Sequence, residues 1–299
     1  MGGETLSTAE LVPIAVCGGF AALVIVPCIL CCFIDIRTPY YQRSCQPTNT
    51  CPKPHEVEEA RVRVYYARST SIIGACGCHP WVALKEERGT QWEIWQVIGW
   101  RLWMGLDSVV DRRSGAPDRL WYGQTPVLAG EVTGARAEEA IPRIRAAAAD
   151  YRFAGRYTLC PGPNSNTFVA HLVRSAGLGI AMPPMCIGKD YIYHGCGCVQ
   201  RPASGSGVQC NEGCGMFGFT CSYAEGLRLQ ICMMEFGFNL CRLELHWPGI
   251  GTIRLRACCG GRDDDESCVG PVRPWPLTDE ERAAAVAGMT GWNLEDGVL

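Results

Sequence analysis

The feature that most constrains this chain of 299 residues is an uncharged apolar run near its start. The run, LVPIAVCGGFAALVIVPCILCCFI, extends from Leu11 to Ile34. As a helix it is long enough to cross the ~30 Å hydrocarbon core of a bilayer, and prolines are tolerated within such a helix. It is too long for a typical signal peptide, and no basic segment precedes it. We therefore expect residues 1–36 to form a retained transmembrane anchor.

The charged residues beside the run predict its orientation. Glu4 and Glu10 precede it, whereas Arg37, Arg43 and Lys53 follow it. Because basic flanks favour the cytoplasmic side, the larger C-terminal part is expected on the cytoplasmic or matrix-like side of the membrane. The chain is thus predicted to be a single-pass integral membrane protein.

Composition divides the remainder into three parts. Residues 37–60 are rich in proline, cysteine and polar side chains, and we expect a linker there. Residues 61–251 are expected to form the globular domain. Residues 252–299 form an acidic extension, in which Thr278 and Glu281 have capping-box spacing and predict a short helix. The formal net charge is −3 and no basic stripe is present, which argues against nucleic acid as a partner.

The chain contains 20 cysteines, so it is cysteine-rich. Their spacing does not form the paired C-x-x-C blocks of a zinc site, and no metal or cofactor is expected. We expect most of them to be small buried apolar side chains. Disulfides near Cys45 and Cys51, or between Cys210 and Cys221, remain open at this point, and so does the redox compartment.

Alternating apolar and polar residues predict three strands at the start of the globular domain. They lie around Val62–Ala67, His79–Lys85 and Gln91–Trp100. The last two are close enough to form a hairpin with Gly89 in its turn. Strand-like runs recur further along, for example GLRLQICMM and LCRLELHW.

Two helices are predicted between these groups of strands. Residues 135–151 have helical spacing, although Pro142 must either start a new helix or kink this one. A second helix is expected from Asn166 to Ser175, with Gly177 as its C-terminal stop. The predicted fold class is therefore α+β, with a mainly antiparallel sheet and helices packed on one side.

Candidate chemistry begins at the start of this second helix, in CPGPNSNTFVAHL. Asn164, Ser165 and Asn166 stand where a helix presents free backbone N–H groups and a positive dipole end. In the hairpin, His79 shares a face with Gln96, which can orient its ring. Ser165, His79 and Gln96 would then form a nucleophile, a general base and an orienting group. Alternatively, Ser165 or Asn164 only caps the helix, a contribution of ~1 kcal/mol.

Several motifs resemble those of a family of membrane-anchored bacterial proteins of unknown function. The motifs, in order along roughly Arg61–Thr252, are CHPWVALK, VIGW, WYGQTPVL, IPRI, CPGPNSNTFVAHL, MPPMCIGKDY, EGLRLQ and WPGIGT. This resemblance includes the N-terminal apolar anchor. It implies no particular activity.

His79 followed by NSNTFV is similar, more distantly, to circularly permuted papain-like hydrolases of the NlpC and lecithin-retinol-acyltransferase kind. In those enzymes the nucleophile is the cysteine of an Asn-Cys-x-x-Phe motif at a helix N-terminus. Asn164 and Phe168 match that motif, and Ser165 stands in place of the cysteine. The resemblance implies a permuted papain-like fold. Because a helix end does not ionise a hydroxyl as it does a thiol, Ser165 would need His79 as its base.

Three functions follow as alternatives. The first, which we favour, is a non-catalytic accessory or scaffold subunit of a larger membrane complex, with other subunits and lipid as partners. The cysteine-rich composition favours a mitochondrial inner-membrane assembly. The second is a membrane-anchored Ser/His hydrolase acting on an amide, ester or acyl group. The third is a lipid- or small-molecule-binding module, with a pocket bordered by His79, Trp81 and Ser165.

Overall fold

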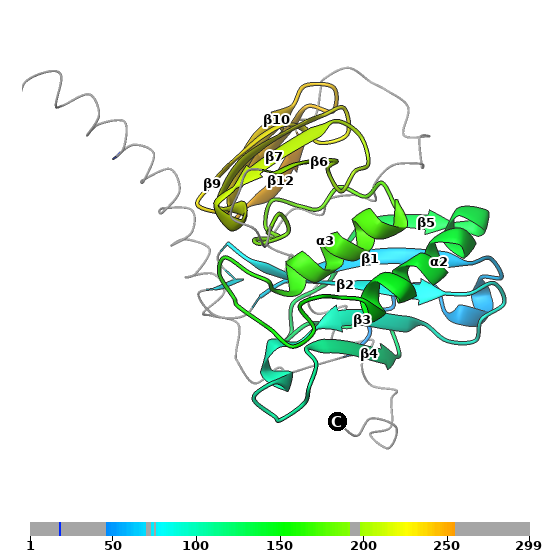
Figure 1. The fold of residues 1–299 in the computed structure, drawn as a ribbon. Coiled ribbons are helices and arrows are strands. Elements are labelled where there is room, and N and C mark those ends of the chain that lie inside the picture. Colours follow the sequence, from blue (N-terminus) through cyan, green and yellow to red (C-terminus); the bar gives the residue numbers. More distant parts are fainter. Residues whose placement is uncertain (1–17, 19–45, 70–72, 75, 192–197, 255–299) are drawn as a thin grey trace, which may run out of the picture.

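The structure, a computed structural model, describes residue 18 and residues 46–69, 73–74, 76–191 and 198–254 (Figure 1). The run from Leu11 to Ile34 lies outside the described residues, except for Gly18. So does the acidic extension beyond residue 254, with the short helix expected near Thr278. Within the described ranges, no helix combines the length and the apolar character needed to cross a bilayer.

The first half of the described chain forms a five-stranded antiparallel sheet with the strand order β4-β3-β2-β1-β5. Its strands are β1 (Arg61–Arg68), β2 (Cys78–Lys85), β3 (Glu93–Val97), β4 (Val110–Ser114) and β5 (Val127–Thr133). The first three correspond to the alternating patterns of the sequence. The β2–β3 hairpin closes where the Gly89 N–H donates to the Glu86 carbonyl at 2.9 Å.

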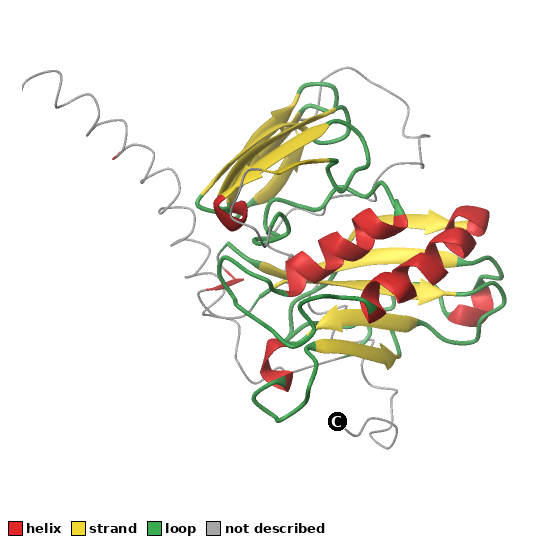
Figure 2. Ribbon diagram, viewed as in Figure 1, coloured by secondary structure: helices red, strands yellow, loops and turns green. Residues whose placement is uncertain are grey.

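Two helices, α2 (Gly134–Ala149) and α3 (Ser165–Ala176), cover one face of this sheet (Figure 2). Pro142 lies inside α2, which continues through it as one helix. Gly177 ends α3 in the left-handed conformation, with φ of 65°, as the sequence predicts. The apolar side chains of both helices join those of β1 and β2 in the larger core.

The other face of the sheet is covered by irregular chain and two short 3-10 helices, η1 (Pro54–Glu56) and η3 (Gly99–Arg101). A second core of aromatic and apolar side chains, including Trp81 and Trp121, fills this face. Residues 46–60, predicted as linker, are bound here. The backbone N–H groups of Thr50 and Cys51 donate to the Asp118 carboxylate at 2.7 and 3.0 Å.

The second half forms a seven-stranded antiparallel meander, with the strands in sequence order. They are β6 (Cys198–Gln200), β7 (Val208–Glu212), β8 (Phe217–Ser222), β9 (Gly226–Ile231), β10 (Met234–Asn239), β11 (Glu244–Trp247) and β12 (Gly251–Arg254), with η4 (Gly213–Gly215) after β7. The boundary predicted between residues 251 and 252 therefore falls inside β12. In Figure 1 this sheet forms a separate layer beside α3.

The two faces of the seven-stranded sheet are inverted relative to an ordinary soluble sheet. The side facing α3 and the rest of the protein carries buried polar residues, among them Gln209, Thr220, Arg228, Gln230, Glu235 and His246. The outward side, here called the apolar face, carries exposed apolar residues. These are Val199, Val208, Phe217, Phe219, Leu227, Leu229, Ile231, Phe238 and Leu245.

The predicted fold class, a permuted papain-like α+β fold built on one mainly antiparallel sheet, is wrong for the described residues. The described residues form two antiparallel sheets with 12 strands in all and only two α-helices, and no described helix can span a membrane. The error has a physical source. The glycine-rich strands after residue 198 have their own two-residue alternation, and they pair with one another instead of extending the first sheet.

The cysteines also differ from expectation. Of the ten described cysteines that are free thiols, only Cys78 and Cys186 are buried, and four are exposed. Cys210 and Cys221, considered above as a disulfide, are both free thiols. Cys45 lies outside the described residues. Most described cysteines are therefore not core side chains.

Candidate functional site

The start of α3 is capped by Asn164. Its Oδ1 accepts from the backbone N–H groups of Asn166 at 2.9 Å and Thr167 at 3.2 Å, and the Thr167 hydroxyl oxygen accepts in return from the Asn164 N–H at 3.0 Å. The Asn164 Nδ2 donates to the carbonyls of Leu159 and Ile187. This residue therefore fixes both the helix start and the loops beside it, so Asn164, and not Ser165, provides the cap.

Ser165 is the first residue of α3 and is 5% exposed. Its hydroxyl makes no hydrogen bond to any described residue. Next to it, Asn166 is turned toward the sheet. Its Nδ2 donates to the Ile187 carbonyl at 2.7 Å, and its Oδ1 lies 3.9 Å from the Cys78 thiol.

His79 lies on the opposite face of β2 from α3. In the β1–β2 pair it stands across from Ala67, whose side chain belongs to the second core. Its ring stacks on Trp121 with 3.8 Å between centroids. Its Nε2 donates to the side-chain oxygen of Gln96, Oε1, at 3.1 Å. Trp81, on the same face, donates its indole N–H to the Pro117 carbonyl at 2.7 Å.

The structure thus brings His79 and Gln96 together but leaves Ser165 apart from them. Neighbouring residues of a strand point to opposite faces, so Cys78 meets the α3 start while His79 points away from it. A general base must lie within hydrogen-bond reach of the proton that it removes. No described hydrogen bond joins His79 to Ser165, and the sheet lies between the helix and the ring.

The surroundings of His79 also hold its ring neutral. Burial lowers the pKa of His79 to about 3, and the nearby charges of Arg119 and Arg113 act in the same direction. The Gln96 Oε1 also accepts from Arg119 at 3.2 Å, and the Gln96 Nε2 donates to the Asp111 carboxylate at 2.7 Å. These contacts describe a satisfied polar cluster within a core.

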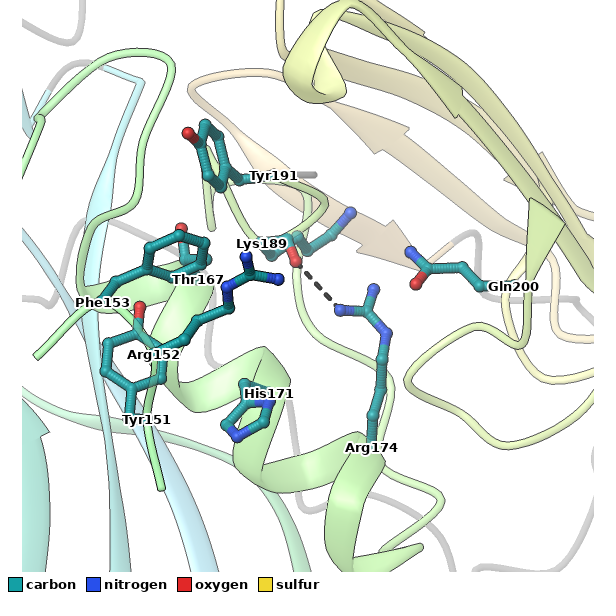
Figure 3. Close-up of a pocket in the computed structure, with 9 residues that line it drawn as sticks. All are labelled: Tyr151, Arg152, Phe153, Thr167, His171, Arg174, Lys189, Tyr191 and Gln200. Carbon is teal, nitrogen blue, oxygen red and sulfur yellow. Dashed lines mark hydrogen bonds between the residues drawn. The ribbon is translucent and has the colours of Figure 1, made fainter. Parts of the chain in front are cut away.

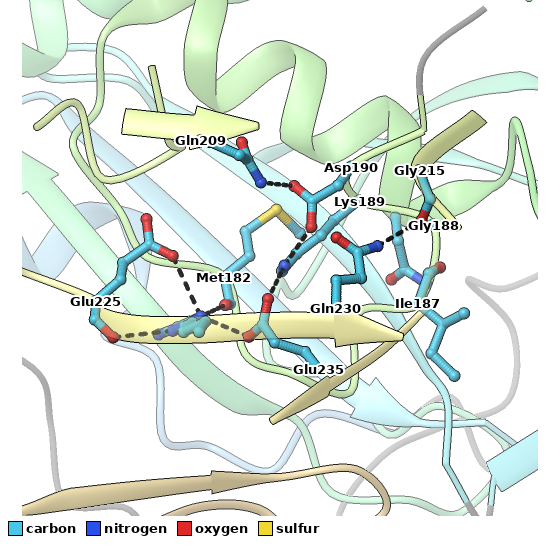
Figure 4. A network of polar contacts seen from close by, with 12 residues as sticks. Met182, Ile187, Gly188, Lys189, Asp190, Gln209, Gly215, Glu225, Gln230 and Glu235 are labelled. Atoms are coloured by element: carbon cyan, nitrogen blue, oxygen red, sulfur yellow. Dashed lines mark hydrogen bonds and ion pairs between the residues drawn. The ribbon is translucent and has the colours of Figure 1, made fainter. Parts of the chain in front are cut away.

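A second polar cluster lies between the two sheets and centres on Lys189 and Asp190 of MPPMCIGKDY (Figure 4). The Lys189 ammonium donates to Asp190 at 2.5 Å and to Glu235 on β10. Asp190 also accepts from Arg174 of α3 at 2.9 Å and from Gln209 of β7 at 2.6 Å. The Asp190 carboxylate therefore accepts hydrogen bonds from both α3, which packs on the first sheet, and the inner side of the second sheet.

Arg228 of β9 extends this cluster across the inner side of the second sheet. It donates to Glu235 at 2.8 Å and to the Met182 carbonyl at 3.1 Å, and it lies 3.2 Å from the Glu225 carboxylate. The cluster contains three cations and three carboxylates, so its formal charges cancel. We call it the buried ion network.

All members of the buried ion network with shifted pKa values are held in their charged forms. Burial would raise the pKa of Asp190, but the charges of Lys189 and Arg174 outweigh it and hold that pKa at about 2. The pKa of Glu235 is lowered in the same way, and that of Lys189 is raised by its two carboxylates despite burial. These charged groups join α3 and the loop before residue 191 to the inner side of the second sheet.

A pocket of about 170 Å³ opens beside the network (Figure 3). The turn after α2 contributes Tyr151, Arg152 and Phe153. The outer side of α3 contributes Thr167, His171 and Arg174. The remaining lining residues are Lys189, Tyr191 and, from β6, Gln200. None of the nine is a carboxylate, whereas three are permanent cations.

These features describe an antiparallel two-sheet protein with a buried ion network at the junction and a cationic pocket beside it. Residues 59–191 match the model of a family described as a protein of unknown function (DUF3750). The matched stretch holds β1 to α3 and ends at Tyr191, so it includes Lys189 and Asp190 but not the seven-stranded sheet. No curated protein and no solved structure matches the chain.

Sequence reasoning missed both the buried ion network and the pocket. Lys189 and Asp190 appear in the sequence only within the motif MPPMCIGKDY, and IGKD lacks the upstream glycine of a phosphate loop. A usable signal was present further along. Polar side chains occupy alternate positions in β7, β9 and β10, at Gln209, Arg228, Gln230 and Glu235, and this predicts a strand face that needs polar partners.

Proposed function

We propose that this protein is a membrane-docked, non-catalytic accessory protein that lies on a lipid bilayer through its apolar face. The single observation that carries the proposal is that the seven-stranded sheet buries its polar face and exposes its apolar face. The anchor predicted at Leu11–Ile34 would hold the same chain at the same membrane. The accessory role is preferred over a hydrolase because the separation of His79 from α3 leaves Ser165 without a base.

The apolar face is continuous across the sheet. Strand register aligns Leu245, Phe238, Leu227, Cys221 and Val208 in one row. A second row runs through Phe236, Leu229, Phe219, Cys210 and Val199. Apolar contacts between neighbouring strands thus continue from β6 to β11.

Exposure of such a face to water is unfavourable. Phe217 and Leu229 are each 51% exposed, and Val199 is 72% exposed. Complete burial of one large apolar side chain contributes about 1.5–3 kcal/mol, and nine such residues lie side by side on this face. Exposed contiguous apolar patches of this kind mark membrane or protein contact sites.

Charge distribution favours a bilayer as the occupant. In these rows and in the third, which aligns Met234, Ile231 and Phe217, the only charged side chain is Glu212 at the end of β7. A protein interface usually contains more polar groups among its apolar ones. An apolar surface whose one charged side chain lies at the end of a strand fits the acyl boundary of a bilayer, into which monotopic proteins insert their apolar side chains.

The proposal can be tested with the full chain in vesicles whose lipids carry a photoreactive diazirine in the acyl chain. After irradiation, mass spectrometry of peptides locates the attached lipid. We expect labelled peptides from β8 and β9, in residues 217–231, in addition to peptides from 11–34. Peptides from the solvent side of α2 should remain unlabelled.

A matched pair of double variants controls this experiment. Phe219→Asp with Leu229→Asp places two charges on the apolar face and should abolish labelling of β8 and β9. Trp103→Asp with Met104→Asp changes two exposed apolar residues of the loop after η3. This variant should leave the labelling of β8 and β9 unchanged. Labelling confined to residues 11–34, or a dimer that buries the apolar face in its interface, would contradict the proposal.

A further inference from the structure

We propose that Cys78 and Cys186 form a redox-active thiol pair, which closes into a disulfide under oxidising conditions and joins the first sheet covalently to the loop before the second sheet. Cys78 is the first residue of β2, and Cys186 lies in the loop between α3 and β6. Both are free thiols, and their Sγ atoms are 3.3 Å apart although the residues are separated by 108 positions in the chain. This site is independent of the apolar face.

Hydrogen bonds on both sides of Cys186 hold the two sulfurs in contact. The Cys78 backbone N–H donates to the Met185 carbonyl at 3.1 Å. The Ile187 carbonyl accepts from the Asn166 Nδ2 at 2.7 Å, and the Asn166 Oδ1 lies 3.9 Å from the Cys78 Sγ. The S–S bond of a disulfide is about 2.05 Å long, so the two sulfurs need to approach each other by only about 1.3 Å.

The thiol pair is enclosed in the larger core. Cys78 is 4% exposed and Cys186 is 1% exposed, and both pack among the apolar side chains of that core. One buried thiol alone would act as a small apolar side chain. With two sulfurs in contact, oxidation of one places the other beside it as an intramolecular nucleophile, which is effectively at a much higher concentration than any external thiol.

The proposed chemistry is thiol–disulfide exchange with a small-molecule disulfide, such as oxidised glutathione. The Cys78 thiolate attacks one sulfur of the reagent, forms a mixed disulfide and releases one small thiol. The Cys186 thiolate then attacks the Cys78 sulfur, forms the internal disulfide and releases the second small thiol. Two cysteine thiols are thus oxidised, one reagent disulfide is reduced, and the two thiol protons pass to the released thiols.

The environment of Cys186 explains this order of attack. Burial and the adjacent Cys78 thiol raise the pKa of Cys186, so it remains protonated while Cys78 is a free thiol. Formation of the mixed disulfide removes the neighbouring thiol, and the positive charge of Lys189 favours the Cys186 thiolate. Because a reagent reaches either sulfur only when the loop opens locally, oxidation of the folded protein should be slow.

The position of the thiol pair connects it to the junction between the two sheets. The Lys189 N–H donates to the Cys186 carbonyl at 3.0 Å, so both residues belong to one turn. Lys189 and the next residue, Asp190, pair with Glu235 of β10 and Arg174 of α3 in the buried ion network (Figure 4). A covalent bond from β2 to this turn should limit any opening that separates the network from the first sheet.

Peptide mapping tests the pairing, with the full chain in micelles of an uncharged detergent. The folded chain and the chain refolding from urea are both equilibrated with mixtures of reduced and oxidised glutathione. Free thiols are then blocked with N-ethylmaleimide, and the unreduced digest is analysed by mass spectrometry. We expect a peptide pair linked through Cys78 and Cys186, whose fraction rises with oxidised glutathione and disappears in dithiothreitol. Refolding exposes both thiols to the reagent, so their burial does not prevent the test.

A matched pair of variants tests the effect of the disulfide on the junction. In the wild-type chain, oxidation should raise the melting temperature by several degrees and slow amide hydrogen exchange in residues 182–191. Cys186→Ala should remove both effects, whereas Cys241→Ser, which changes an exposed thiol, should retain them. Melting temperatures under reducing conditions verify that each variant is folded.

Three outcomes would overturn the proposal. The first is that Cys78 and Cys186 stay unlinked, in the folded and in the refolded chain, at glutathione ratios that oxidise exposed thiols such as Cys221. The second is a stable link from either residue to a third cysteine. The third is a Cys78–Cys186 link without slower hydrogen exchange, which would remove the role at the junction. All three can be observed whether or not the apolar face contacts lipid.

Discussion

His79 on β2 and Ser165 at the start of α3 are separated by the five-stranded sheet. The ring of His79 stacks on Trp121 in the second core, whereas α3 packs into the larger core on the other face. The residue that does meet the start of α3 is Cys78, through Asn166. A serine hydroxyl requires a base to become nucleophilic, and this arrangement provides none.

Ser165 should therefore not react with serine-directed probes. We expect the full chain and its Ser165→Ala variant to show the same fluorophosphonate labelling, at background level, when compared by gel fluorescence and peptide mass spectrometry. A known serine hydrolase in the same reaction verifies that the probe is active. Labelling that disappears only in Ser165→Ala would show that the hydroxyl is activated after all.

The capping role of Asn164 leads to a second prediction. Asn164→Ala removes the acceptor for two N–H groups and two further Nδ2 hydrogen bonds, whereas Ser165→Ala removes none. Loss of a cap costs about 1 kcal/mol, and loss of the two Nδ2 hydrogen bonds, each worth about 0.5–1.5 kcal/mol, raises the expected loss in unfolding free energy to about 2 kcal/mol or more. Ser165→Ala should stay within about 0.5 kcal/mol of wild type. Urea unfolding in micelles, followed by tryptophan fluorescence, measures both, and equal losses would contradict this assignment.

Local signals explain how far the sequence could be interpreted. β1, β2 and β3 have the two-residue alternation of half-buried strands, and α3 begins at an asparagine cap and ends at Gly177. Each of these depends on neighbours within a few residues. The contact between His79 and Gln96 also follows from a local rule, since the hairpin turn decides which residues share a face.

Relationships between elements could not be predicted in this way. Alternation shows that a strand has two different faces, but not which face another element covers. That choice placed His79 away from α3, and it also placed the polar side of the second sheet inward. Glu235 on the inward side pairs with Lys189, which is distant in sequence from β9 and β10, and Arg174 of α3 pairs with Asp190. Such pairings depend on the complete fold.

The buried ion network predicts a large and asymmetric response to substitution. Glu235→Ala removes a partner of both Lys189 and Arg228 and leaves buried positive charge unpaired. Breaking a buried pair in this way costs about 3–5 kcal/mol, whereas an exposed pair contributes about 0–1 kcal/mol. Glu139→Ala, which removes the exposed partner of Arg143, is the matched control. Urea unfolding should show the large loss for Glu235→Ala only, and comparable losses in the two variants would contradict the role of the network.

The neutral, buried ring of His79 predicts how stability depends on pH. Burial lowers its pKa from 6.5 to about 3 in the folded protein, so between these values the unfolded chain binds a proton that the folded protein does not. Its contribution to stability is therefore complete above pH 6.5 and is lost as the pH falls toward 3, by up to about 1.4 kcal/mol per pH unit. Burial also lowers the pKa values of His171 and His246, so both residues add to the dependence of the unfolding free energy on pH in every variant. Urea unfolding between pH 7 and 4 should show a smaller dependence of the unfolding free energy on pH for His79→Gln than for wild type. Equal dependence on pH in the two proteins would mean that His79 is protonated in the folded state.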